Sequence, residues 1–346
     1  MKTILACAMA VAAAVALPTV VQAATLTPKP APLPITGIRS IGITVSDIDA
    51  ALAFYASAVP YKVVRRYRFD AARLAPELVG KPHRGIEIAL VRMPNMFIQL
   101  MDFTPGEPAV PEVRPVIGPG YTHICFQSPA TDSAYPRFRE AGLAMVSRGD
   151  TPVDIGGYGV LYAYGRDADG TMIENEVLTT PKFTDRIRVS HIANVTPDRD
   201  AMLAFYEKLL GYPVRLKTDA VKSRKYDDIG DIDGIVLKGA WFSVGNMELE
   251  FWQYLNPVTP RPVADRKLDA LGYNALNFEV ADVGKERRRL QRLGVRLAGR
   301  VVTIGGWKTQ FAYDPDGNLF SVQQDGGGNA GESIGAHIGA FPPKRS

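Results

Sequence analysis

Residues 47–55 read DIDAALAFY, and residues 198–206 read DRDAMLAFY. The two segments lie 151 residues apart (198 − 47), and at the same spacing NMFIQ at 95–99 returns as NMELE at 246–250. A repeat period of this length indicates duplicated structural units rather than a short-repeat solenoid. Equivalent positions can therefore be compared within this one chain.

The repeated segment is typical of a helix that follows a strand. Ser46 or Asp47 can serve as N-cap, and apolar residues recur at helical spacing up to Ala58. An alternating pattern predicts a preceding strand at 38–45, and strand-like runs follow the helix at 62–69, 85–92 and 96–103. The second copy predicts a strand at 189–195, a helix at 198–210 and strands at 214–218, 234–238 and 241–254, the last folded in two around Gly245.

A second pair of units lies between and after these two. GYTHICF at 120–126 matches GYNALNF at 272–278, and AYGRDADG at 163–170 matches the turn AYDPDG at 312–317. A helix is expected after the first strand of each, ending near Gly142 or Gly294. The chain therefore reads as four units, each with a strand, a helix and then about three strands.

The N-terminus has the pattern of a secretory signal peptide. Lys2 is followed by an apolar run from Ile4 to Val21 and a small-residue end at Ala23. We expect a signal peptide at 1–23, a secreted or periplasmic protein, and a proline-rich leader at 24–37; an uncleaved membrane anchor is the alternative. Cleavage removes one of the two cysteines and leaves Cys125, so no internal disulfide can form.

The remaining boundaries follow from the units and their proline-rich connections. We expect a first domain at 38–178 with modules 38–103 and 120–178, and a second at 187–324 with modules 187–254 and 272–324. Residues 325–346 are rich in glycine and are expected to be a poorly ordered tail. Removing Lys2 lowers the net charge from +4 to +3, and no dense basic stripe indicates nucleic acid. No segment after the signal peptide is apolar enough to predict a membrane span.

These features resemble the vicinal oxygen chelate superfamily, which includes glyoxalase I, extradiol dioxygenases, epimerases and fosfomycin-resistance proteins. The resemblance is carried by the helices at 47–55 and 198–206 and by the turn DPDGNL at 314–319, and it spans roughly 38–324. It implies an α+β fold in which four βαβββ modules pair into two half-open, cup-shaped sheets. It also implies a metal inside a cup, held by the first strand of a module (usually His) and the last (usually Glu).

The resemblance places the first-strand ligand seven residues before the helix aspartate. That position is His191 in the third module and Ser40 in the first. The alignment of the other two first strands gives His123 in the second module and Ala275 in the fourth. Two of the chain's four histidines thus fall on candidate metal positions.

The last-strand ligand lies four residues after the turn glycine. This gives Glu174 in the second module and Ser321 in the fourth, while the repeat spacing gives Gln99 and Glu250 in the first and third. Side chains alternate along a strand, so each glutamate has an alternative two residues away on the same face. These alternatives are Glu176 and Glu248, and the register favours Glu174 and Glu250.

The pairing of modules decides what these residues can do. If modules one and two pair, each cup holds one His and one Glu, which makes a weak site. If two pairs with three, one cup receives His123, Glu174, His191 and Glu250, and the other is structural and has no metal. We infer the second arrangement, because four N/O ligands with room for water suit a divalent ion such as Zn²⁺, Ni²⁺, Fe²⁺ or Mn²⁺.

A divalent ion that holds two vicinal oxygens stabilises an enediolate, and a glutamate of tuned pKa can move the proton. The first hypothesis is therefore an exported, metal-dependent, glyoxalase-like lyase, isomerase or epimerase. It would act on a small hydroxy-ketone or aromatic substrate, with Glu174 or Glu250 as the base. Export disfavours a glutathione adduct as substrate.

Two alternatives remain open, and the sequence predicts neither the substrate nor the oligomeric state. An extradiol ring-cleaving dioxygenase would need two His and one Glu from the C-terminal half, where Ala275 and Ser321 depart from the pattern. A metal-free binding protein would use an aromatic pocket. Its candidate lining residues are Tyr121, Trp241, Trp252, Tyr254, Tyr273 and Trp307.

Overall fold

The computed structural model describes residues 34–103, 113–180 and 186–336. All of them belong to one compact unit that begins at Leu33. The signal peptide expected at 1–23 lies outside these residues, as does His337. No helix in the described ranges is long and apolar enough to span a membrane.

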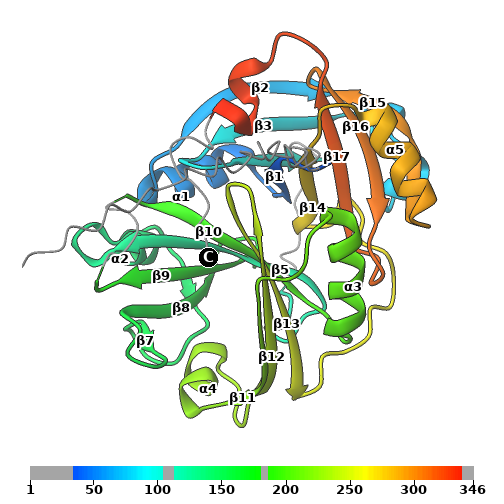
Figure 1. The fold of residues 1–346 in the computed structure, drawn as a ribbon. Coiled ribbons are helices and arrows are strands. Elements are labelled where there is room, and N and C mark those ends of the chain that lie inside the picture. Colours follow the sequence, from blue (N-terminus) through cyan, green and yellow to red (C-terminus); the bar gives the residue numbers. More distant parts are fainter. Residues whose placement is uncertain (1–33, 104–112, 181–185, 337–346) are drawn as a thin grey trace, which may run out of the picture. The chain divides into compact units, whose positions relative to one another are not determined.

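The described strands form two mixed sheets, which we call sheet A and sheet B (Figure 1). Sheet B contains modules two and three in the order β11-β12-β13-β10-β5-β9-β8-β6, with β7 paired to β8. Module two consists of β5 (Gly120–Pro129), α2 (Ala134–Glu140), β6 (Ala144–Met145), β7 (Val153–Asp154), β8 (Val160–Arg166) and β9 (Met172–Leu178). Module three consists of β10 (Arg188–Val195), α3 (Arg199–Leu210), β11 (Leu216–Lys222), α4 (Arg224–Gly230), β12 (Val236–Val244) and β13 (Met247–Asn256).

Sheet A contains modules one and four in the order β15-β16-β17-β14-β1-β4-β3-β2. Module one consists of β1 (Gly37–Thr44), α1 (Ile48–Ala58), β2 (Lys62–Phe69), β3 (Ile86–Arg92) and β4 (Phe97–Asp102). Module four consists of β14 (Gly272–Glu279), α5 (Val283–Arg292), β15 (Arg296–Ile304), β16 (Trp307–Tyr313) and β17 (Leu319–Asp325). Short 3-10 helices lie at Ala71–Arg73, Pro76–Leu78, Ala130–Asp132, Ala330–Glu332 and Ile334–Ala336.

Each sheet joins its two modules through their first strands. In sheet B, β5 pairs antiparallel with β10, and in sheet A, β1 pairs antiparallel with β14. Within each module the first strand also pairs in parallel with the last one. The α+β class and the four modules are confirmed, and the modules pair two with three and one with four.

The repeated motif forms the helix that the sequence predicts, and its aspartate caps it. The carboxylate of Asp47 accepts hydrogen bonds from the backbone of Asp49 and Ala50, and that of Asp198 accepts one from Ala201. The second helix ends at Gly211, whose φ of 84° suits glycine. The tyrosine at the end of the motif is buried in both copies, with 2% of Tyr55 and 0% of Tyr206 exposed. These helices therefore dock through their aromatic face.

Three details differ from the sequence-based expectation. The runs at 234–238 and 241–244 form one strand, β12, and α4 appears where no apolar stripe predicts a helix. The tail expected to be poorly ordered from 325 onward instead packs on sheet A as far as the described residues extend. Its anchors are Glu332 and Ile334, which are 7% and 0% exposed. The glycine-rich composition of this segment gave no indication that these two side chains would be buried.

Candidate metal centre

The four sequence-predicted site residues lie on four neighbouring strands at the centre of sheet B. His123 is on β5, Glu174 on β9, His191 on β10 and Glu250 on β13. In the register, Ala193 of β10 pairs with both His123 and Glu250. The pairing of module two with module three thus brings these four positions into one cup.

Strand alternation explains why these side chains face inward. On β5, Phe126 packs against Phe138 of α2, with ring centroids 5.3 Å apart, so the even-numbered residues face the helix. His123 and Cys125 consequently point into the cup. All ten residues of β5 are buried, which is expected of a strand covered on both faces.

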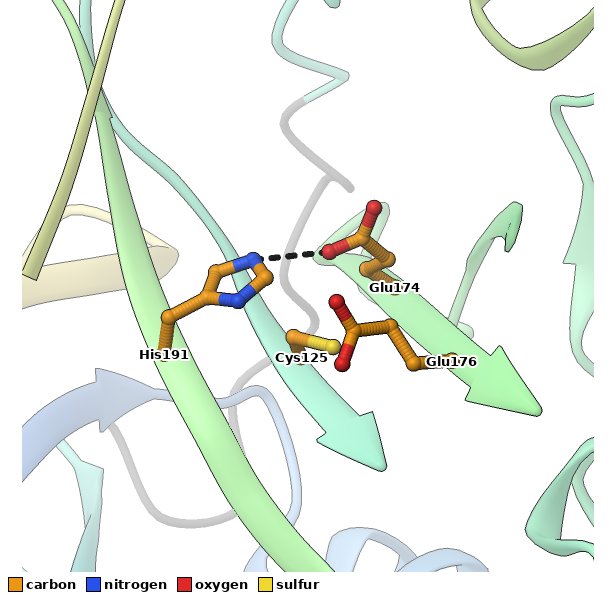
Figure 2. Close-up of side chains that lie close together, drawn as sticks. All are labelled: Cys125, Glu174, Glu176 and His191. Atoms are coloured by element: carbon orange, nitrogen blue, oxygen red, sulfur yellow. Dashed lines mark ion pairs between the residues drawn. The ribbon is translucent and has the colours of Figure 1, made fainter. Parts of the chain in front are cut away.

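The two imidazoles converge on the two carboxylates. His191 Nε2 lies 2.7 Å from Glu174 Oε2 and 3.3 Å from Glu250 Oε2. His123 Nε2 lies 3.5 Å and 3.6 Å from the same two oxygens. All four residues are buried, with at most 4% of each exposed. Figure 2 shows His191 directed at Glu174, with Cys125 and Glu176 beside them.

The chemistry of these atoms fits a cation. His123 Nε2, His191 Nε2 and Glu174 Oε2 are buried, yet none makes a well-oriented hydrogen bond to a described residue. Buried polar atoms normally have such partners, and a single cation could serve all three of these convergent atoms. One ligand atom each from His123, His191 and Glu250 lie within 4.8 Å of one another. The four residues of the cluster could hold a metal ion. Their role as metal ligands remains a prediction.

Electrostatics within the cluster favours the charged forms of His191 and Glu174. Burial alone would lower the pKa of His191, but the carboxylates of Glu250 and Glu174 outweigh it and raise that pKa to about 10. Burial likewise opposes ionisation of Glu174, and the two histidines reverse this and lower its pKa. Metal uptake would therefore displace protons from the imidazoles.

Glu250 is held by two indoles. Trp241 Nε1 donates to Glu250 Oε1 at 2.7 Å, and Trp252 Nε1 donates to Oε2 at 2.5 Å. Glu174 has no indole partner, because the third tryptophan, Trp307, donates to Glu332 in sheet A. The two carboxylates thus differ in their partners: Glu250 accepts from two neutral indole donors, and Glu174 faces the two imidazoles.

The alternative glutamates occupy different surroundings. Glu248 pairs with Arg215 at 2.7 Å and takes no part in the four-residue cluster. Glu176 accepts a hydrogen bond from Gln127 at 2.6 Å and groups with Cys125, Glu174 and His191. Burial raises the pKa of the Cys125 thiol, which disfavours the thiolate that a soft metal would need. The structure thus presents two overlapping candidate ligand sets, one of His and Glu and one that contains cysteine.

Aromatic residues form a wall of cup B, the hollow of sheet B. The ring of Tyr164 lies 5.0 Å from that of His123, and Tyr254 and Trp252 belong to the same apolar cluster. Three of the expected pocket aromatics lie elsewhere: Tyr121 contacts Tyr206 in the core, Tyr273 donates to the Met172 carbonyl, and Trp307 belongs to sheet A. The sequence could not separate these cases, because aromatic residues in strands serve core and pocket alike.

Cup A, the hollow of sheet A, has different chemistry at the equivalent positions. Ser321 Oγ donates to Asn277 Oδ1 at 2.7 Å, and Asn277 Nδ2 donates to Ser40 Oγ at 2.9 Å. The remaining equivalents, Gln99 and Ala275, line a cavity of ≈ 20 Å³. The polar side chains here satisfy one another, so these positions form no counterpart of the His/Glu cluster.

Comparison with known proteins identifies the class. Models of the Glyoxalase/Bleomycin resistance protein/Dioxygenase superfamily match residues 39–162 and 188–322. The chain belongs to this superfamily and contains two domains of this kind.

Individual relatives cover different parts of the chain. An ethylmalonyl-CoA/methylmalonyl-CoA epimerase from Cereibacter sphaeroides is 25% identical over 140 residues, which are 40% of this chain and 96% of that protein. The crystal structure of glyoxalase I from maize (Zea mays) is 17% identical with a TM-score of 0.55, covering 84% of this chain and 92% of that one. A candidate dioxygenase from Bacillus subtilis is 12% identical with a TM-score of 0.53, covering 88% and 90%. The two structures establish similarity of fold alone.

Proposed function

We propose that this protein is a metal-dependent enzyme that moves a proton on a small hydroxy-ketone or aromatic substrate, as a lyase, isomerase or epimerase. The observation that carries the proposal is the convergence of His123 and His191 on Glu174 and Glu250. Relatedness to an epimerase and the fold shared with glyoxalase I support it.

The four residues would hold a divalent ion such as Zn²⁺, Ni²⁺, Fe²⁺ or Mn²⁺. When bound, such an ion polarises a substrate carbonyl and stabilises the negative charge that develops on its oxygen. His123, His191 and Glu250 would keep their positions, since the indoles of Trp241 and Trp252 fix the carboxylate of Glu250.

Glu174 is the better candidate for the base. A base must leave its resting contacts, reach a carbon-bound proton and return it, which requires a carboxylate that can rotate. Glu250 would have to break two indole hydrogen bonds to do so, whereas Glu174 contacts the two imidazoles. The carboxylate of Glu174 would therefore take up and deliver the proton.

The aromatic wall would exclude water from this step. Burial raises the pKa of both Tyr164 and Tyr254, so their hydroxyls stay protonated and available as donors to substrate oxygen. A site depleted of water strengthens electrostatic interactions with the charge that develops in the reaction.

Hydrogen exchange tests this function directly. In D₂O, the metal-loaded protein should catalyse the incorporation of deuterium into its substrate at a carbon next to a carbonyl. The reaction should not consume oxygen. Glu174→Gln should lose the exchange and keep the metal, while Glu250→Gln should lose the metal. Exchange that is unchanged in Glu174→Gln would reject Glu174 as the base. A protein that takes up no divalent metal would leave the metal-free binding protein as the remaining hypothesis.

One observation favours a second candidate, a ring-cleaving dioxygenase. His123, His191 and Glu250 form a set of two histidines and one carboxylate, the ligand set of many non-haem Fe²⁺ oxygenases. The set draws one histidine from each half of the chain, instead of both from the C-terminal half. Oxygen consumption with a catechol by the Fe²⁺-loaded protein would support this candidate, and its absence alongside deuterium exchange would exclude it.

We further propose export of the mature protein, on the pattern at residues 1–23. N-terminal sequencing of the protein purified from a bacterial periplasm should begin at Ala24 or one residue later. A protein that retains Met1 and stays in the cytoplasm would contradict this.

A further inference from the structure

Cup A contains a buried carboxylate supplied by the C-terminal tail. Glu332 Oε2 lies 3.0 Å from Arg65 Nη2, 3.4 Å from Arg39 Nη2 and 3.0 Å from Trp307 Nε1. The side chains of Glu332 and Arg39 are 9% and 3% exposed. Arg39 also stacks on Trp307, with its guanidinium 3.7 Å from the ring centroid. The guanidinium groups of Arg39 and Arg65 and the indole of Trp307 thus surround the carboxylate of Glu332.

The anion position has more donors than Glu332 can satisfy. Two guanidinium groups face this one carboxylate, and the Nε atoms of Arg39 and Arg65 are buried without a hydrogen-bond partner among the described residues. A second carboxylate, Glu279, accepts from Ser333 Oγ and from the backbone of Ile334, and it also interacts electrostatically with Arg39. The two guanidinium groups thus keep buried donor capacity that Glu332 does not use.

The anion position adjoins the cavity of cup A. Arg39 Nη1 donates to Gln323 Oε1 at 3.0 Å, and Gln323 lines the cavity. The opposite walls are apolar and include Phe69, Ile88 and Phe311. With the tail in place the cavity measures ≈ 20 Å³, which holds about one water molecule. A larger ligand can enter only when side chains around the cavity move.

The internal repeat shows what the tail covers. Arg65 corresponds by the 151-residue spacing to Leu216, and Trp307 corresponds to Tyr158 in the matching Gly-Gly-aromatic turn. Leu216 and Tyr158 are 45% and 71% exposed at the edge of cup B, whereas Trp307 is 2% exposed. The segment that carries Glu332 therefore closes an edge of cup A that is open in cup B.

We propose that cup A is a second, metal-free binding site for a small monocarboxylate with an apolar body, and that Glu332 occupies its anion position when no ligand is bound. The ligand carboxylate would replace that of Glu332 between Arg65, Arg39 and Trp307. Its apolar part would extend past Gln323 toward Phe311. This proposal does not depend on the chemistry of the metal centre.

Competition by a tethered group sets the expected size of the effect. A side chain on a short tether acts as a competitor at roughly millimolar effective concentration. Removing its charge should therefore tighten binding of an external carboxylate by about tenfold or more. A neutral analogue of the same shape should be unaffected by the change.

Calorimetric titration of the full-length mature protein with phenylacetate and with phenylacetamide tests the proposal. Glu332→Gln should bind phenylacetate at least about tenfold more tightly than the wild type, and Arg65→Gln should bind it more weakly. Phenylacetamide should bind all three proteins alike. His123→Ala, which alters the other cup, should bind phenylacetate like the wild type.

Opposite results would overturn the proposal. Equal phenylacetate affinity in Glu332→Gln and the wild type would show that Glu332 guards no anion site. Loss of binding in His123→Ala would place the ligand in cup B. Ile334→Ala serves if Glu332→Gln fails to fold, because it loosens a buried anchor of the tail and leaves all charges intact. It too should tighten phenylacetate binding, and unchanged affinity in this variant would reject the role of the tail.

Discussion

Cups A and B are each built from two modules of the same kind, yet the side chains at their equivalent positions differ in chemistry. Cup B gathers two imidazoles and two carboxylates, and three of their facing atoms, on His123, His191 and Glu174, lack well-oriented partners. At equivalent positions cup A has a chain of hydrogen bonds from Ser321 through Asn277 to Ser40. At these equivalent positions, polar atoms lack partners in cup B and satisfy one another in cup A.

The difference teaches where to look for function in a duplicated fold. The backbone register is the same: Cys125 pairs with Glu174 in cup B, and Asn277 pairs with Ser321 in cup A. Only the side chains changed, so the scaffold does not require histidine or glutamate here. Buried charge is costly unless it has a partner, and its presence in cup B supports the proposal of a metal there.

The largest expected effect comes from removing a histidine of cup B. His123→Ala and His191→Ala should each abolish metal binding and activity, and the double variant should do little more, because residues of one site act as a unit. Metal content of the purified proteins measures this. Ser40→Ala, the counterpart of His191, should leave the metal content unchanged. Full metal binding by either histidine variant would contradict the proposed metal centre.

The next effect separates the two glutamates. Glu174→Gln should lower the rate of proton transfer by about 10²- to 10⁴-fold while most of the metal remains, because it removes the base. Glu250→Gln should instead lower the metal content, because it alters a proposed metal ligand. Parallel measurement of exchange rate and metal stoichiometry checks both, with Gln99→Ala as the counterpart control in cup A. Equal metal loss in the two variants would assign both carboxylates the same role.

A smaller effect tests the indole clamp on Glu250. Trp252→Phe removes one hydrogen bond to a ligand carboxylate, and such changes weaken metal affinity by roughly 10- to 100-fold. Competitive titration with a chelating dye measures the affinity. Trp307→Phe removes the matching indole donor in cup A and should leave metal affinity as it is. A loss of similar size in both variants would mean general destabilisation.

The smallest effect concerns a feature that both cups share. Burial raises the pKa of Asp314, in the turn before β17, to about 7, and that of Asp167 in the matching turn of module two to about 7. The folded state then keeps a proton that the unfolded state loses near pH 4, so stability falls as the pH rises from about 4 toward 7. Each group adds a slope of at most about 1.4 kcal/mol per pH unit. Urea unfolding of Asp314→Asn and Asp167→Asn across this range should show shallower slopes than the wild type, and an unaltered slope would contradict the shift.

Much of this architecture was readable from the sequence because it is repeated. The helix motif at 47–55 and 198–206 identified modules one and three, and the matching runs at 120–126 and 272–278 identified modules two and four. The modules follow from repeats along the chain, which the sequence reports directly, whereas the positions of His191 and Glu250 as ligands are what the family resemblance implies. The pairing of modules two and three followed from chemistry, since it alone gathers all four candidate ligands.

The missed features depend on contacts between distant residues. The indoles of Trp241 and Trp252 bind Glu250 through side-chain orientation, which strand alternation does not specify. Glu332 is buried because it meets Arg39, 293 positions earlier in the chain. A glycine-rich stretch has no local pattern that signals such a contact. Sequence therefore indicated where ligands could gather, and the coordinates added what holds them and what covers the other cup.

The crosswise pairing of modules has a consequence for how such a molecule can change over generations. Two identical half-length chains, associated in the same way, would each lend a module to both hollows, and those hollows would be copies of one another. Every inherited substitution would then appear twice. Fusion of the halves into one polypeptide removes that constraint, so a histidine can persist at 123 while its counterpart at 275 becomes alanine. A single continuous chain can therefore keep the His/Glu cluster in one cup while the equivalent positions of the other cup change.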